Sequence, residues 1–161
     1  MIFIIMNLNE HIYRIKNLMY EQPQVQVSIN GDIDKDFGKY LELKSKDNFP
    51  IGGMFVTKMS NANNVDPDFN KLFDEKKFQT IPLNYDNSLF MHSLEIDKDY
   101  QRNGYGSQLL DHCHNFAKQN GYHYLTFMAY DDNIPAKNLY KNRGYKKLNS
   151  DENVEFYFVE L

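Results

Sequence analysis

The sequence predicts a mixed α/β (α+β) protein whose sheet is mostly antiparallel but contains one parallel pair of strands. Alternating apolar residues separated by turn residues fill the first half of the chain, which is typical of antiparallel hairpins. A strand, an amphipathic helix and a second strand then follow one another between residues 89 and 129. Such a βαβ unit joins parallel strands, because its connection is long enough to return the chain to the end of the sheet at which the first strand began.

The first half is predicted to contain one helix and three strands. Apolar residues at helical spacing predict a helix over residues 12–19. Alternation predicts a strand over residues 25–29, and two further extended segments cover residues 37–43 and 51–59. The Gly52-Gly53 pair inside the last segment predicts a β-bulge.

Residues 60–87 form a long excursion that is rich in Asn and Asp. It contains one amphipathic fragment around Phe69, Leu72, Phe73 and Phe78. Excursions of this length in compact domains are usually functional lids or disordered segments, and the simpler interpretation is a solvated loop with one helical turn.

The second half alternates strands and helices more regularly. Helix starts and stops are marked by Asn and Pro at one end and by Gly at the other. The predicted elements are a strand over 89–96, a helix around 109–117, a strand over 122–129, a helix from Asn133 to Gly144, and a closing strand pair at Leu148 and over 154–161.

Length, charge and cysteine content limit the possible classes of function. The 161 residues, 42% of them hydrophobic, are enough for one domain with a packed core. A net charge of −4 argues against a nucleic-acid surface and suits a cationic substrate better. Cys113 is the one cysteine, so the chain has no intrachain disulfide and no Cys-rich metal site.

The start of the chain predicts no targeting signal. Residues 1–6 are apolar, but polar residues follow at once, so the segment is too short for a signal peptide or a membrane span. Met1 and Met6 are both candidate start residues. We expect a cytoplasmic protein without membrane contact.

The turn between the 89–96 strand and the next helix carries the strongest chemical signal. Glycines at 104 and 106 allow a close approach of the backbone, and a helix N-terminus presents unpaired N–H groups to an anion. Arg102 adds a positive charge, so a diphosphate is the natural ligand. Leu109 stands where the dinucleotide-binding pattern needs a third glycine, and no P-loop lysine follows. A glycine-containing turn without a ligand is the alternative.

Two motifs resemble those of the GNAT superfamily of N-acetyltransferases. Residues 101–106 match that family's acyl-CoA pyrophosphate loop, which is Gln or Arg, two residues, Gly, one residue, then Gly or Ala. The second motif is Asn133, Ala136, Leu139 and Tyr140, followed by Gly144-Tyr145. The resemblance implies a central, mostly antiparallel twisted sheet, with a splayed parallel strand pair and helices on both faces.

The resemblance also implies how the chain is divided. Residues 1–161 would form one GNAT-like domain. Residues 1–88 would be its substrate-side half, with 60–87 as an insertion, 89–148 the acetyl-CoA-binding core, and 149–161 a closing strand. The match is close over the core and holds only in outline for the substrate-side half.

Acetyl-CoA is the co-substrate that the resemblance implies, without a metal ion. Its pantetheine arm would lie between the splayed strands, against the main chain of Leu94 and Ile96, and Asn133 would touch the arm. The diphosphate would lie on the backbone of Gln101, Arg102, Asn103, Gly104, Tyr105, Gly106 and Ser107.

Tyr140 is implied as the general acid. Asn133, Ala136 and Tyr140 are three and four residues apart, so they share one face of the predicted helix. A phenol with a pKa of about 10 can protonate a departing thiolate, whose ordinary pKa is about 8.5. The alternative is that Tyr140 is one of twelve tyrosines and packs the helix against the sheet.

The attacking amine also needs a base, because only about one part in 10³ of an alkylamine is neutral at pH 7. Glu95 is the first candidate, with a solvated carboxylate as its alternative role, and His92 is the second. By strand parity they point to opposite faces unless a bulge intervenes. Members that acetylate protein N-termini commonly carry a Glu five residues before the motif Asn, and here Met128 stands there.

The other clusters of ionisable residues are weaker evidence for a functional site. Asp131 and Asp132 could bind a cationic substrate, although such a pair before a helix is more often a cap. His112 and His114 lie on different faces of their helix, so they do not predict a metal site, and Cys113 falls in the apolar stripe.

We therefore expect an N-acetyltransferase that transfers acetyl from acetyl-CoA to a primary amine by direct attack in a ternary complex. The alternatives are a non-catalytic acyl-CoA-binding or interaction module and, less well supported, a nucleotide-binding regulatory domain. Polyamine, aminoglycoside, amino acid and protein lysine all remain open as acceptors, and a homodimer is expected. Substrate choice is expected from the acidic residues of the excursion, which are Asp66, Asp68, Asp74 and Glu75.

Overall fold

The computed structural model describes residues 25–31, 38–73, 83–151 and 153–161. The helix expected over 12–19, as well as Asp74, Glu75 and Phe78, lies outside these residues. The described elements are, in order, β1 (Val25–Asn30), β2 (Lys39–Ser45), β3 (Pro50–Lys58), η1 (Met59–Asn61), α2 (Ala62–Val65), α3 (Phe69–Leu72), β4 (Ser88–Ile96), η2 (Lys98–Tyr100), α4 (Tyr105–Gln119), β5 (Tyr124–Tyr130), α5 (Ile134–Asn142), β6 (Lys146–Asp151) and β7 (Val154–Glu160).

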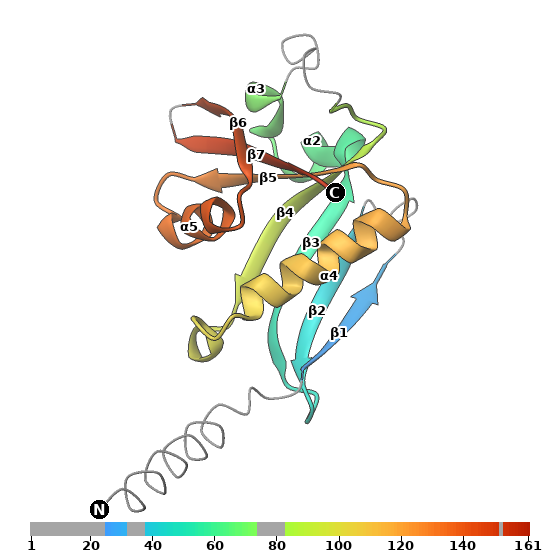
Figure 1. Cartoon of the computed structure of the whole chain (residues 1–161), viewed down its shortest axis with the longest axis vertical. Coiled ribbons are helices and arrows are strands. Elements are labelled where there is room, and N and C mark those ends of the chain that lie inside the picture. Colours follow the sequence, from blue (N-terminus) through green and yellow to red (C-terminus); the bar gives the residue numbers. More distant parts are fainter. Residues whose placement is uncertain (1–24, 32–37, 74–82, 152) are drawn as a thin grey trace, which may run out of the picture.

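The strands form one seven-stranded sheet in the order β1-β2-β3-β4-β5-β7-β6. Every neighbouring pair is antiparallel except β4 and β5, which run parallel. The mixed class predicted from the sequence is therefore confirmed. Figure 1 shows helix α4 lying across β2 and β3, in the connection between the two parallel strands.

Helices cover both faces of this sheet, as expected. On one face, α4 and α5 pack on a core that includes Leu41, Val56 and Leu125. The apolar stripe of α4 is buried as predicted, and Cys113 within it is fully covered. Burial raises the pKa of the Cys113 thiol to about 12, so this side chain fills space rather than reacting.

The other face is covered by the described part of the 60–87 excursion. Phe69 and Phe73 are buried against Phe90 and Phe156, with ring centroids 5.0 Å (Phe69 to Phe90) and 5.8 Å (Phe73 to Phe156) apart. The simpler expectation of a solvated loop is therefore wrong for this part. Phe69 and Phe73 belong to the amphipathic fragment identified in the sequence, and their aromatic side chains supply a second core.

Strands β4 and β5 separate after a short pairing. Ser88–Met91 of β4 pairs with Tyr124–Phe127 of β5, and the two strands are not paired beyond these residues. The splay that the resemblance implied is thus present. It opens toward the loop that precedes α4.

Two bulges alter the alternation of side chains in the sheet. The β2–β3 register skips Ile51, next to the predicted Gly52-Gly53 position. A second bulge was not predicted: Phe55 pairs with Ser93 and Val56 with Met91, which leaves His92 unpaired on β4. Gly52 serves close packing of the strands, because a Cβ there would overlap the backbone of Glu95 on β4.

Within the described residues, no helix is both long enough and apolar enough to cross a membrane.

Candidate active site

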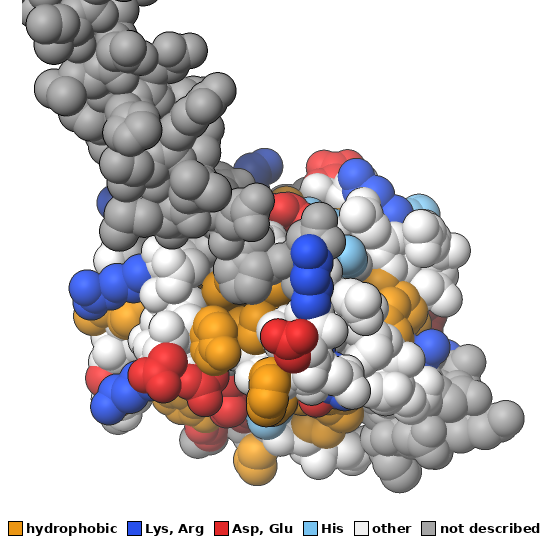
Figure 2. Space-filling view, turned by 90° about the horizontal axis from the view of Figure 1, so that it is seen from below, with side chains coloured by type: hydrophobic (Ala, Val, Ile, Leu, Met, Phe, Trp, Pro, Cys, Tyr) orange, Lys and Arg blue, Asp and Glu red, His pale blue; other side chains and the backbone are white. Residues whose placement is uncertain are grey.

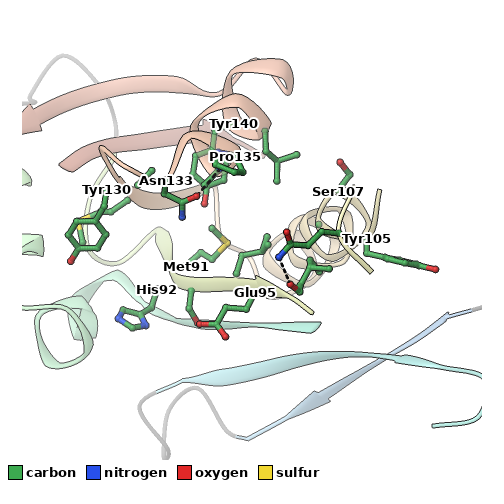
Figure 3. Close-up of a pocket in the computed structure, with 18 of the residues that line it drawn as sticks. Met91, His92, Glu95, Tyr105, Ser107, Tyr130, Asn133, Pro135 and Tyr140 are labelled. Atoms are coloured by element: carbon green, nitrogen blue, oxygen red, sulfur yellow. Dashed lines mark hydrogen bonds between the residues drawn. The ribbon is translucent and has the colours of Figure 1, made fainter. Parts of the chain in front are cut away.

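A cavity of about 720 Å³ occupies the gap between β4 and β5. This volume lies within the usual range for small-molecule sites. The cavity is lined by β4, the loop before α4, the first turn of α4, the end of β5 and one face of α5 (Figure 3). All twelve site residues expected from the sequence except Asn103 are among its lining residues.

The main chain of β4 presents two residues to this gap. The N–H of Asp97 donates to the carbonyl of Ile51 on β3 at 2.8 Å. Backbone groups alternate sides along a strand, so those of Leu94 and Ile96 face away from β3 and toward the opening. The carbonyl of Ile96 accepts a hydrogen bond from Gln101 Nε2 at 2.9 Å, which ties the following loop to the strand.

The loop before α4 has an unusual backbone. Arg102 has φ 62° and Gly104 has φ 83°, so two nearby residues adopt left-handed conformations. For a non-glycine residue such a conformation costs about 1 kcal/mol or more, and strain of this kind concentrates at ligand sites. The side-chain amide of Asn103 donates to the carbonyls of Tyr100 (3.3 Å) and Gln101 (3.2 Å) and thereby holds the turn in shape.

The first turn of α4 leaves three amides for a ligand. The first hydrogen bond of the helix runs from the Gln108 N–H to the Gly104 carbonyl, at 3.1 Å. Gly104 is the N-cap residue and has no side chain to cap the helix. The N–H groups of Tyr105, Gly106 and Ser107 therefore lack intrahelical partners. Together with the helix dipole, this geometry suits an anion such as a diphosphate.

The two glycines of the loop have different roles. Gly104 needs its freedom, because an L side chain rarely adopts its positive φ. Gly106 is helical, and a Cβ there would meet Leu139 only at 3.5 Å, which is ordinary contact. The side chain of Tyr105 is 2% exposed and points away from the cavity in Figure 3, so its contribution to the site is its backbone.

Asn133 is the N-cap of α5. Its Oδ1 accepts the N–H of Ala136 at 3.2 Å, and its amide nitrogen points into the cavity in Figure 3. The structural role of the cap and contact with a cofactor are therefore compatible, because they use different atoms of one side chain.

Tyr140 lies at the inner wall of the cavity. Its ring stacks on Phe127 with centroids 4.8 Å apart and meets Tyr157 edge-on at 5.4 Å, while its hydroxyl is directed to the cavity (Figure 3). Burial in this aromatic layer raises the pKa of Tyr140 above its ordinary value of 10. The phenol therefore stays protonated at neutral pH, as a proton donor must.

The bulge on β4 brings both candidate bases to one face. Leu89 and Met91 face the α4 core before the bulge, and Leu94 and Ile96 face it afterwards. The alternation therefore changes phase at His92. His92 and Glu95, which strict parity would separate, both project to the side opposite α4 (Figure 3).

Asp66 joins this group from the α2–α3 connection. Its side chain is only 8% exposed, it lines the cavity, and its Oδ2 lies 3.9 Å from Nε2 of His92. Its other carboxylate oxygen accepts the N–H of Asp68 at 3.0 Å. The sequence marked Asp66 only as one of four acids in a long excursion, since nothing local to it predicts burial.

Other predicted residues are used elsewhere. Asp131 forms an ion pair with Lys137 at 2.8 Å, and Asn133 rather than either aspartate caps α5. His114 contacts the Tyr145 hydroxyl at 2.7 Å, while His112 is exposed. No group of three or more potential ligands for a metal ion occurs in the described ranges.

One cluster that the sequence did not predict fastens α4 to the end of α5. Arg143 Nε donates to the Tyr145 hydroxyl at 3.0 Å, and its guanidinium pairs with Asp111. Tyr145 in turn stacks on Phe127, the ring that supports Tyr140. The motif predicted the aromatic residue but not the ion pair between Arg143 and Asp111, which are 32 residues apart along the chain.

The surface at the lower end of Figure 1 carries charges of both signs. Figure 2 shows Lys and Arg side chains interspersed with Asp and Glu around apolar groups on this face, without a continuous basic area. This mixture of charges agrees with the net charge of −4.

Comparisons with known proteins show which family and which solved structures this chain is similar to. Residues 67–145 match the sequence model of the Acetyltransferase (GNAT) family. No curated protein matches the sequence. A GNAT-family acetyltransferase structure from Listeria monocytogenes is similar with a TM-score of 0.59 at 11% identity, over 76% of this chain and 64% of that one.

Two further structures show the same fold. An acetyltransferase from Bacillus cereus has a TM-score of 0.55 at 19% identity and covers 97% of this chain and 89% of its own. The PaiA N-acetyltransferase of Thermoplasma acidophilum, solved in complex with coenzyme A, has a TM-score of 0.55 at 15% identity, over 76% of this chain and 60% of that one. The present chain thus spans less than two thirds of the Listeria and Thermoplasma proteins.

Proposed function

This chain carries a GNAT acetyltransferase domain, and we propose that it transfers the acetyl group of acetyl-CoA to a primary amine by direct attack in a ternary complex. The family and the fold support an acyltransferase that uses acetyl-CoA. The acceptor, the direct attack and the residue roles below are parts of the proposal.

The observation that carries the proposal is that the splayed part of β4 leads directly to the uncapped N-terminus of α4. The part of β4 beyond its pairing with β5 leads along the cavity to the N–H groups of Tyr105, Gly106 and Ser107 at the start of α4. A flexible arm with amide groups could pair with the strand while its diphosphate binds the helix terminus. The donors present therefore fit coenzyme A.

The chemical roles follow from position and charge. Main-chain N–H groups at the splay would polarise the thioester carbonyl, and Tyr140 would donate its phenolic proton to the departing thiolate. Glu95 or His92 would take the proton that the amine must lose. Arg102 would contribute its charge at the diphosphate end, where it makes no ion pair with any described residue.

A turnover screen tests the proposal. Acetyl-CoA is incubated with the protein and, in turn, spermidine, kanamycin, free lysine and a lysine-containing peptide, and free thiol is measured against an amine-free control. We expect at least one amine to raise thiol release at least tenfold. Calorimetry with CoA and with ATP is run in parallel.

Each outcome has a clear meaning. CoA binding no tighter than ATP binding would refute the CoA site. Tight CoA binding without turnover on any amine would favour the non-catalytic acyl-CoA-binding module.

A further inference from the structure

The inner end of the cavity holds an acid–imidazole pair that the fold, rather than a local motif, assembles. His92 is the extra residue of the β4 bulge, and Asp66 comes from the segment between α2 and α3. Both line the cavity, and 3.9 Å separates Asp66 Oδ2 from His92 Nε2. This distance is within ion-pair range but longer than a hydrogen bond.

The position of His92 along β4 places it where the chemistry would occur. Pairing between β4 and β5 ends at Met91, so His92 is the first residue of the splay. The rise of a strand puts it about 12 Å from Ile96, which adjoins the pyrophosphate loop. Glu95 lies about 10 Å nearer to that loop than His92 does, next to Ile96.

Asp66 is placed to orient the imidazole. Its side chain is more than nine-tenths buried, and a buried carboxylate needs compensation by hydrogen bonds or an opposite charge. One oxygen has the Asp68 N–H as its partner, whereas the other has only His92 nearby among the described residues. With the Nε2 proton directed at this oxygen, the lone pair of the ring stands on Nδ1.

Two further contacts restrict the ring. Phe55 on β3 meets it edge-on, with centroids 6.4 Å apart, and the bulge fixes the backbone that carries it. The other titratable groups around this end of the cavity are Glu95 on β4, Tyr130 at the end of β5 and Tyr140 on α5. Neither Lys nor Arg lines the inner end among the described residues, so the local charge favours an approaching ammonium group.

We propose that His92 is the proton acceptor for the attacking amine and that Asp66 is its positioning residue. This inference rests on the proposed function. His92 Nδ1 takes one proton from the substrate ammonium, the neutral nitrogen forms the C–N bond at the thioester carbonyl, and the C–S bond breaks. The thiolate takes its proton from Tyr140, and the second nitrogen proton leaves to solvent as the amide forms.

Four variants test the assignment: His92→Ala, Asp66→Asn, Glu95→Gln and, as a matched control, His112→Ala on the exposed side of α4. With acetyl-CoA and the best amine of the screen, we expect His92→Ala to lower kcat/KM by about 10²-fold. Added imidazole should restore part of this loss, because a free base can occupy the vacated space. His112→Ala should stay within about threefold, and the loss of kcat/KM in Glu95→Gln should be at least tenfold smaller than in His92→Ala, because the proposal gives the proton transfer to His92.

The role of Asp66 is tested by a pH profile. Removing its charge in Asp66→Asn destabilises the imidazolium, so the acid limb of kcat/KM should move to lower pH, while kcat/KM at neutral pH falls about tenfold. CoA affinity by calorimetry should be unchanged in all four variants, which shows that each is folded. A purely structural role for Asp66 would lower activity without moving the limb.

The results separate this inference from the proposed function. If the wild-type protein turns over and His92→Ala is fully active, the assignment is overturned and the proposed acetyltransferase function stands. The same conclusion follows if only Glu95→Gln loses activity. Loss of activity in His92→Ala that imidazole does not restore, together with an unmoved limb in Asp66→Asn, would also overturn it. A wild-type protein without turnover would refute the proposed function instead.

Discussion

The two ends of the cavity are built in different ways. The end at the loop before α4 is made mainly of backbone from one continuous stretch, residues 101–107, with a strand edge beside it. The opposite end is made of side chains: Asp66 from the α2–α3 connection, His92 from β4, and Tyr130 from β5. A backbone site leaves a compact trace in the sequence, whereas a side-chain site forms only when distant segments meet.

The largest effect is expected at Tyr140, where the two ends meet. Tyr140→Phe keeps the ring stacked on Phe127 but removes the proton donor. We expect kcat to fall by about 10²-fold or more, with CoA affinity nearly unchanged. Stopped-flow or steady-state thiol release measures the first quantity and calorimetry the second. An unchanged kcat would show that Tyr140 only packs the helix.

The same residue predicts a feature of the pH profile. Burial raises the pKa of Tyr140, so the phenol is still protonated where an exposed tyrosine would begin to ionise. Activity should therefore not decline through ionisation of this group below about pH 10. A decline in kcat near pH 9 that Tyr140→Phe abolishes would contradict this.

The next largest effect is expected at Gly104. An alanine at φ 83° costs roughly 1–2 kcal/mol, so Gly104→Ala should weaken CoA binding about tenfold if the bound loop keeps this conformation. Gly121→Ala is the matched control, because Gly121 has φ 77° and open space around it, and it lies at the far end of α4. Equal losses of affinity in both variants would show that the effect is only one of stability.

Variants of Asn133 test its helix-capping role separately from its proposed contact with the ligand. Asn133→Asp keeps an oxygen for the Ala136 N–H but has no amide donor, so the melting temperature should change little. CoA affinity should drop about fivefold, as expected for one lost hydrogen bond. Asn133→Ala should lose both affinity and about 1 kcal/mol of stability. Unchanged CoA binding in the aspartate variant would leave Asn133 with its structural role alone.

The smallest effect is expected at Gly106. Its Cβ position is 3.5 Å from the nearest side chain, and alanine favours a helix over glycine by about 1 kcal/mol. Gly106→Ala should raise the melting temperature by about 3 °C and change CoA affinity less than twofold. A large loss of affinity would mean that the ligand approaches this backbone more closely than the free cavity indicates.

The same contrast explains what could be predicted from the sequence. The parallel pair and helix α4 follow from local periodicity, and the glycine-containing loop before α4 follows from the 101–106 motif. The bulge at His92 does not, because it depends on pairing with β3 rather than on a glycine or proline of its own strand. Asp66 is unexceptional in sequence and becomes distinctive only in the folded chain, where it is buried.

The hydrogen bond from Gln101 to the Ile96 carbonyl has a kinetic consequence. It holds the turn against the strand, so the shape of the proposed diphosphate site is formed on folding. Complex formation then requires little loop rearrangement, and its rate should be governed by diffusion and orientation. Removing this bond, as in Gln101→Ala, should slow association and make it more sensitive to temperature, since the loop would first have to order.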